Sequence, residues 1–351
     1  MRGLISFHPV EPDFFHAVVQ PLVAGDKIDP EPFLTRAMQM RVGSWAARRY
    51  VHTMDLLLEQ SVPPPAPTGG TLWEKVRSRM EVFDFKADPL ATRVKHAVVR
   101  DLHLLGRPYL IADASPEKVG EAVAAFCSAG TAAVVDQLVD DQLDRMTPKL
   151  GGHIQPESDS EMPPDMSYRA ELMEILKEIH DLAIAARKGE IWTAHDGGRE
   201  PASTVLPVRL PWQAMWLHSR IHPFWMGLDV DGLETICKAT GMPSPEELVP
   251  AVSLFGDACD EFPKVRDELH HEITSPRSIG GYVSPEGVPA LVEFLKKNGA
   301  RIIQAATRQG EGTRCTVLLR KIRECATYAA ASGLGYLEAS GIEPIGPTLT
   351  D

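Results

Sequence analysis

Apolar side chains recur every three or four residues through most of this 351-residue sequence, and this spacing constrains the fold more than any other feature. In an α-helix it gathers the apolar side chains on one face. The stretch 88–105 shows it clearly, because Asp88 and Pro89 open it and Gly106 closes it. We therefore predict a mainly α-helical fold, a multi-helix bundle. Its helices are expected over 12–23, 31–59, 71–84, 88–105, 116–146 with a break near Gly130, 172–182, 232–241, 245–254, 288–298 and 313–331.

The tripeptide Ser-Pro-Glu occurs at 115–117, 244–246 and 284–286. A serine oxygen accepts a free N–H group of the first helical turn, and proline presets the first helical φ angle. The glutamate suits the positive end of the helix dipole. Each copy therefore predicts the start of a helix.

Few segments have the composition of β-strands. Residues 3–7, 109–113 and 335–340 are the best candidates, because each contains a short apolar run. The first and the last lie near opposite ends of the chain. We expect these two to pair, so that a few short strands near the chain ends close the bundle.

Three stretches lack helical periodicity: the proline-rich 61–70, the acidic 147–165, and 190–211, which is rich in Gly, Pro and Thr. The first is short enough to connect two packed helices. The second has the composition of a solvated linker.

A chain of this length is large enough for two domains. We predict an N-terminal helical domain over 1–150 and a C-terminal helical domain over 166–351. The linker between them is placed at about 150–165, and the two halves can also pack as one unit.

The formal net charge is −12, and no long run of Lys and Arg offsets it. Such a charge disfavours binding to a nucleic-acid backbone and favours a basic partner. No segment has the length and apolar content of a signal peptide or a membrane span. We expect a cytoplasmic protein that binds neither nucleic acid nor membrane.

The five cysteines are scattered and never form a C-x-x-C pair, which argues against a disulfide framework and a thiolate zinc site. Other signatures fail as well. A single Glu-x-x-His unit at 268–271 falls short of the two that a di-iron bundle needs. In "GLGYLE" (333–338), Glu338 stands where a dinucleotide-binding loop needs its third glycine.

The stretch "WLHSRIHPFWMGLDVD" (216–231) has the most chemical character. His218 and His222 have the i, i+4 spacing of two metal ligands on a helix. However, Ser219 stands where a zinc hydrolase has its glutamate, and Pro223 biases His222 away from helical geometry. We therefore predict no metal site here.

The favoured interpretation of this stretch is a packed helix junction with polar tips, and the alternative is a ligand or partner pocket. Asp231 is expected to cap the following helix, with Glu234 completing a capping box. Arg220 is expected to pair with Asp229 or to lie on the pocket rim. The candidate binding residues are Trp212, Trp216, His218, Arg220, His222, Trp225, Asp229 and Asp231.

A second candidate is the acidic helix face formed by Asp136, Asp140, Asp141 and Asp144. The last three match the D-D-x-x-D motif and resemble isoprenoid synthases over five residues. That resemblance implies Mg²⁺ ions holding a diphosphate, with a second acidic motif on a facing helix. The stretches 257–261 and 229–234 do not match such a motif. A solvated or partner-facing acidic edge is the simpler interpretation.

The stretches "YVSPEGVPALVEFL" (282–295) and "LLRKIRECATYAAASGLGYLEASGI" (318–342) resemble the closing part of cytosolic bacterial proteins of the polymorphic-toxin immunity type. A Ser/Thr-Pro-Glu helix start and a final helix followed by a short apolar strand carry this resemblance over about 282–342. It implies a protein that binds a partner and occludes its active site. An acidic binder suits a basic toxin domain.

Our first hypothesis is therefore a non-enzymatic protein-binding protein, an immunity or antitoxin-like inhibitor without catalytic residues or cofactors. The second is a Mg²⁺-dependent enzyme of the isoprenoid-synthase type that uses the acidic face. The third is a small-molecule sensor with an aromatic pocket within 212–231.

Overall fold

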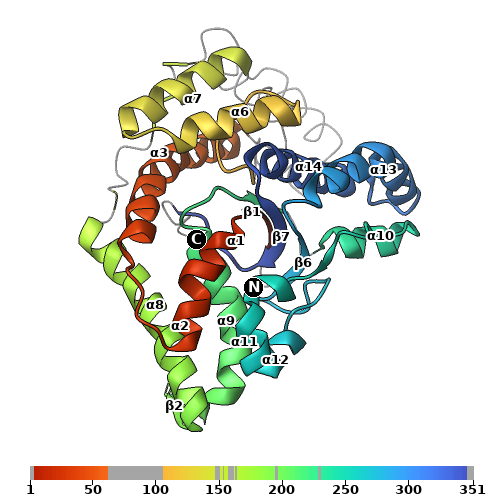
Figure 1. Cartoon of the computed structure of the whole chain (residues 1–351). Coiled ribbons are helices and arrows are strands. Elements are labelled where there is room, and N and C mark those ends of the chain that lie inside the picture. The colour runs from red at the N-terminus through yellow and green to blue at the C-terminus, as the bar shows by residue number, and fades with distance from the viewer. Residues whose placement is uncertain are drawn as a thin grey trace, which may run out of the picture.

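The computed structural model describes residues 4–61, 106–146, 151–152, 154–156, 162, 164–193, 197–227 and 231–345. The helices expected over 71–84 and 88–105, and most of the segments 61–70 and 147–165, lie outside these residues. Within them the predicted fold class is confirmed, because helices dominate and the strands are few, short and antiparallel (Figure 1).

A five-stranded antiparallel sheet lies at the centre of the molecule, in the order β4-β1-β7-β6-β5. The two strands predicted at opposite chain ends pair along their full length, from Ile5 opposite Ser340 to Val10 opposite Gly335, which confirms that expectation. The strands are β1 (Ile5–Val10), β4 (Trp225–Met226), β5 (Val249–Pro250), β6 (Ile279–Val283) and β7 (Gly335–Ser340).

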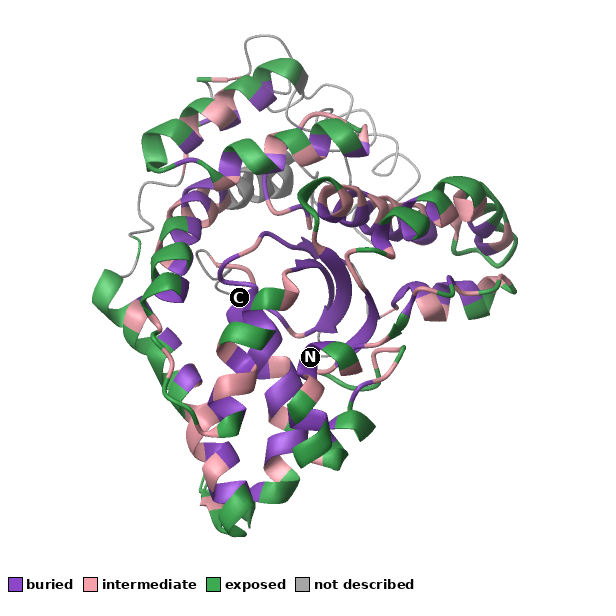
Figure 2. Cartoon of the chain, viewed as in Figure 1, coloured by how far each residue is buried: buried purple, intermediate pink, exposed green. Residues whose placement is uncertain are grey.

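The helices form two groups, one on each side of this sheet. Every residue of β1 and β7 is buried, and Figure 2 shows both strands enclosed by helices. In β7, Tyr336 belongs to one hydrophobic core and Leu337 to the other, as expected when side chains alternate between the faces of a strand. The sheet is therefore the shared wall of two cores.

The first core contains α6 (Pro116–Cys127), α7 (Ala132–Met146), α10 (Leu233–Thr240), α13 (Val288–Arg308) and α14 (Gly312–Ser332). The second contains α1 (Pro12–Phe14), the π-helix η1 (Phe15–Val19), α2 (Gln20–Ala24), α8 (Asp165–Lys188), α9 (Ala202–His218), α11 (Val252–Glu261) and α12 (Pro263–Asp267). The long helix α3 (Glu31–Ser61) contributes to both.

The expectation of an irregular stretch over 190–211 is wrong. Its first part is a small hairpin of β2 (Ile191–Thr193) and β3 (Arg199–Pro201), and α9 begins at Ala202. Pro207 and Pro211 lie inside α9, although each removes a backbone donor. Both are buried where α9 packs along α8, so tertiary packing outweighs the local cost.

The expectation of a strand over 109–113 is also wrong, because this segment is irregular. The ring of Tyr109 stacks on Phe126 of α6, with the ring centroids 4.6 Å apart. The apolar side chains of the segment 109–113 therefore pack against helices and do not belong to a strand. The helix expected over 245–254 is wrong as well: residues 246–247 form a turn, β5 follows, and α11 begins at Val252.

The three Ser-Pro-Glu sequences have different outcomes. Ser115 is the N-cap of α6 and its hydroxyl oxygen accepts a hydrogen bond from the backbone N–H of Lys118 at 3.5 Å, as predicted. At 284–286 the sequence forms a turn just before α13, whose N-cap is Gly287. The copy at 244–246 begins no helix, because the chain enters β5 instead.

A buried ion pair joins the segment after Gly106 to α14. The Nε and NH2 groups of Arg107 donate to the two carboxylate oxygens of Glu324 at 2.9 and 2.5 Å, and both side chains are fully buried. Trp225 of β4 donates its indole N–H to the same carboxylate at 3.2 Å. Each charged group is thus neutralised and hydrogen-bonded, which burial requires.

We expect Arg107→Met and Glu324→Leu each to lower the free energy of unfolding by about 3–5 kcal/mol, because each leaves a buried charge without its partner. The double variant is expected to lose less than the sum of the two single losses. Denaturant unfolding of the four proteins measures this coupling. The exposed pair Arg266 and Asp260 is the control, with about 0–1 kcal/mol expected for its removal. The prediction would be contradicted if the loss of unfolding free energy in the double variant equalled the sum of the losses in Arg107→Met and Glu324→Leu.

The sheet combines β1, from the first half of the chain, with β4 to β7 from the second half. Helix α3 also packs against both α7 and α8. The division at about 150–165 stays a prediction, since most of that segment lies outside the described residues. No helix in the described part of the chain is both long and apolar enough to span a bilayer.

Candidate functional site

A large cavity lies at one end of the central sheet, where β1 and β6 finish and β7 begins. Its volume is about 750 Å³, and we call it the β1 cleft. The antiparallel register places Val10 opposite Gly335 and Val283 opposite Tyr336, so distant segments meet at this end. The lining residues are Glu11, Pro12, Asp13, His16, Arg36, His222, Ser253, Leu254, Tyr282, Ser284, Pro285, Glu286, Tyr328, Ser332, Gly333 and Leu334.

The charged residues in this lining are mostly acidic. Glu11, Asp13 and Glu286 contribute three carboxylates, whereas Arg36 is the one Lys or Arg among the described lining residues. Asp13 and Glu286 are exposed, and they come from segments far apart in the sequence. The mouth of the β1 cleft therefore has an excess of negative charge.

Glu11, Arg36 and His222 form a polar cluster in the cleft wall. One oxygen of Glu11, Oε2, accepts from the Arg36 guanidinium at 2.6 Å and lies 3.0 Å from Nε2 of His222. These two hydrogen bonds lower the pKa of Glu11 to about 2, with the His222 bond contributing most. Glu11 is therefore an ionised carboxylate held in place from two other elements.

His218 packs against this cluster and holds Glu11 in position. Its ring stacks on His222 at 4.7 Å, and its Nε2 accepts the backbone N–H of Glu11 at 3.1 Å. The proton of a neutral His218 must then be on Nδ1, a buried atom without a hydrogen-bond partner among the described residues. Phe14 and Phe15 also contact the ring, so His218 is a packing residue that fixes Glu11 rather than a ligand.

Burial keeps three neighbouring histidines neutral. Desolvation lowers the pKa of His8 to about 3, and it also lowers the pKa of His218 and of His222. The positive charges of Arg220 and Arg36 act in the same direction. His8 lies on β1, where its Nε2 is 2.8 Å from the Ser6 hydroxyl and its ring stacks on Phe224.

The tryptophans of the candidate stretch do not meet at one point. Trp225 is fully buried in β4, in the first core, whereas Trp212 and Trp216 pack against the second core. The guanidinium of Arg277 lies over the ring of Trp212, and that of Arg220 lies 4.3 Å over the ring of Trp216. Among these tryptophans and the two histidines, only His222 lines the β1 cleft.

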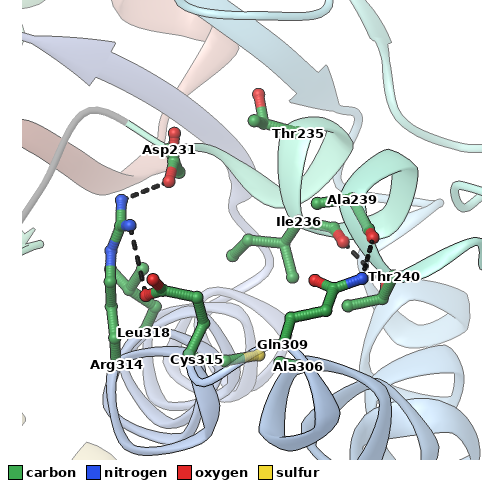
Figure 3. A pocket seen from close by; sticks show the side chains of 11 residues that line it. Asp231, Thr235, Ile236, Ala239, Thr240, Ala306, Gln309, Arg314, Cys315 and Leu318 are labelled. Carbon is green, nitrogen blue, oxygen red and sulfur yellow. Dashed lines mark hydrogen bonds and ion pairs between the residues drawn. The ribbon is translucent and has the colours of Figure 1, made fainter.

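Arg220 is buried, and its NH2 group donates to the backbone oxygen of Glu343 at 2.6 Å. Asp229, the expected partner of Arg220, lies outside the described residues. Asp231 does not cap α10 as expected, because the N-cap is Gly232 and the backbone N–H of Leu233 donates to Glu338 instead. Asp231 pairs with Arg314 at a second, smaller pocket (Figure 3).

The four aspartates of the predicted acidic face lie on α7. Asp136 pairs with Arg49 of α3 at 3.0 Å, and Asp141 accepts from the side chain of Gln137. Asp140 and Asp144 accept from the backbone N–H groups of Gly152 and Gly151. The last two hydrogen bonds attach the segment after α7 to the helix.

Sequence reasoning missed Glu11, Arg36 and Asp13 because no local motif marks them. The only signal is position: Glu11 and Asp13 come shortly after the strand that we predicted over 3–7, which in the structure ends at Val10. It also missed Glu338, a fully buried carboxyl that accepts from the Tyr336 hydroxyl at 2.9 Å. Burial raises the pKa of Glu338 to about 7.

No three His, Cys, Asp or Glu side chains are grouped to hold a metal ion in the part of the chain that the structure describes. Comparison of the chain with protein-family models, curated proteins and solved structures gives no match. The function therefore has to be inferred from the side chains themselves.

We expect the buried histidines to make the fold sensitive to acid. In the unfolded chain a histidine binds a proton near pH 6.5, whereas folded His8 does so only near pH 3. The unfolded state thus binds more protons over this range, and the free energy of unfolding falls as the pH falls. Between about pH 7 and about pH 5, the wild type should lose about 1–2 kcal/mol more than His8→Phe.

Denaturant unfolding at the two pH values measures the difference. The groups that titrate in both proteins, His218, His222 and Glu338 among them, cancel in the comparison. Val10→Ala, also buried on β1, should lower stability by a similar amount at both pH values. Equal pH dependence of the wild type and His8→Phe would show that His8 is charged in the folded state.

Proposed function

We propose that this chain is a non-enzymatic protein-binding protein, an inhibitor of the immunity type, whose β1 cleft takes a basic segment of the partner. The observation that carries this proposal is the charge of the cleft: three carboxylates face a cavity of about 750 Å³, against one guanidinium. Arg36 is already paired with Glu11, so Asp13 and Glu286 are the charges at the mouth.

Electrostatics favours a Lys- or Arg-containing segment as the occupant. A cleft of one sign attracts the opposite charge and raises the rate of encounter, and the net charge of −12 extends this attraction over the molecule. A basic toxin domain has the required charge. Binding of this kind weakens as the salt concentration rises.

The walls of the cleft are held in place before any partner binds. Glu11 is fixed through its side chain by Arg36 and His222 and through its backbone by His218. The strands that end at the cleft belong to a sheet buried on both faces. A preformed site avoids much of the entropic cost of ordering on binding, which supports a role in tight inhibition.

The region of immunity-type resemblance supports the same location. Residues 282–295 and 318–342 contain one wall of the β1 cleft, formed by the turn Ser284–Pro285–Glu286 and by Ser332, Gly333 and Leu334. The other lining residues come from the first 36 residues and from His222, Ser253 and Leu254. An inhibitor that uses the cleft would therefore bind through the part of the chain that carries the resemblance.

We expect the double variant Asp13→Lys/Glu286→Lys to lose binding to a basic partner by at least tenfold, because both exposed charges at the mouth are reversed. The control is Asp267→Lys/Glu268→Lys, which makes the same change of net charge at exposed positions outside the cleft lining. Two measurements apply: pull-down from the native host, and calorimetric titration with an arginine-rich peptide at low and moderate salt.

Partner and peptide binding that the control variant keeps and the cleft variant loses would support the proposal. A third variant, Asp141→Lys/Asp144→Lys, tests the acidic face of α7 as the competing surface. If only this third variant loses the partner, the binding surface is on α7. If the cleft variant binds as tightly as the wild type, the β1 cleft is not the site.

A further inference from the structure

A second pocket lies on the other side of the sheet from α9, in the first core, between α10, the end of α13 and the start of α14 (Figure 3). Its volume is about 170 Å³, and we call it the α10 pocket. It shares no lining residue with the β1 cleft. The residues around it are Asp231, Thr235, Ile236, Ala239, Thr240, Ala306, Gln309, Glu311, Arg314, Cys315 and Leu318.

The floor of the α10 pocket is apolar. Ile236, Ala306 and Leu318 each expose less than a tenth of their surface. Cys315 adds a sulfur atom to the same floor, and burial raises the pKa of its thiol, so it stays protonated. In Figure 3, Ile236 extends from α10 towards α14, and Cys315 lies beneath it.

Most of the polar side chains around the rim are bonded to other protein groups. Arg314 pairs with Asp231 and also reaches Glu311 at 3.5 Å. The Gln309 amide donates to the backbone oxygen of Ala239 at 2.8 Å, and the Thr240 hydroxyl donates to that of Ile236 at 2.7 Å. The Gln309 bond links the end of α13 to α10, whereas the Thr240 bond is internal to α10.

We propose that the α10 pocket binds one neutral aromatic ring of a small molecule. The size fits, because the volume of the pocket is close to the roughly 150 Å³ of an apolar cavity that holds a benzene molecule. The two carboxylates at the rim, against one guanidinium, disfavour an anion. The polarizable sulfur of Cys315 in the floor favours an aromatic ring over a saturated one, because divalent sulfur, as in methionine, makes favourable contacts with ring edges.

The test uses the full-length chain and three probes of similar size: p-cresol, its saturated analogue methylcyclohexanol, and the anion p-toluate. Ligand-observed NMR titration reports binding directly, and a thermal-shift series reports it through preferential binding to the folded state. We expect saturable binding of p-cresol, at least tenfold tighter than that of p-toluate and tighter than that of methylcyclohexanol.

Ala306→Leu places a branched side chain in the pocket and should weaken p-cresol binding at least tenfold. Ala300→Leu, the same change at an exposed position of α13, is the matched control and should bind as the wild type does. Ala239→Leu narrows the mouth from an exposed position of α10, so it keeps the test valid if Ala306→Leu does not fold.

Three results would overturn the proposal. The first is that p-cresol shows no saturable binding, and the second is that all three probes bind equally. The third is that Ala306→Leu and Ala239→Leu leave the binding of p-cresol unchanged. Because the two cavities share no lining residue, the charge-reversal variants of the β1 cleft should bind p-cresol normally. A failure of this proposal is therefore distinguishable from a failure of the proposed protein-binding function.

Discussion

The antiparallel pairing of β1 with β7 is the interaction on which the rest of the structure depends. It joins Ile5–Val10 to Gly335–Ser340, so two segments separated by more than 320 residues lie side by side. Both strands are buried on both faces, so the two cores meet at this sheet, and helix α3 contributes residues to both of them. The β1 cleft follows from it, because the pairing brings the residues after Val10 next to those before Gly335.

Because the sheet is enclosed on both faces, a polar side chain on it has to form its hydrogen bonds with other protein groups. His8 meets this requirement by staying neutral, with Ser6 and Phe224 as its neighbours. Glu338 accepts from Tyr336 and from the backbone of Leu233, and thereby fixes the start of α10. A side chain at Gly232 would collide with that carboxylate, at 2.1 Å from its Oε2 atom.

The two cavities differ in chemistry because they lie in different settings. The β1 cleft opens where strands end and helices begin, so exposed carboxylates from separate segments gather at its mouth. The α10 pocket lies between helices of one core, and its charged rim residues Asp231, Glu311 and Arg314 pair with one another above an apolar floor. We propose a basic protein segment as the occupant of the β1 cleft and a small neutral ring as that of the α10 pocket, and the two sites can be tested independently.

The sequence by itself determined the helices with clear apolar periodicity, such as α13 and α14, and the pairing of the chain ends, because these depend on side-chain spacing and apolar content. It also singled out His222, which lines the β1 cleft. Only the tertiary structure decided that α9 continues as a helix through Pro207 and Pro211. It also decided that Glu338, in place of Asp231, accepts the hydrogen bond at the start of α10, and that Glu11, Arg36 and His222 meet. Contacts between residues 25 and 211 positions apart leave no local pattern, since they exist only once the sheet has brought their segments together.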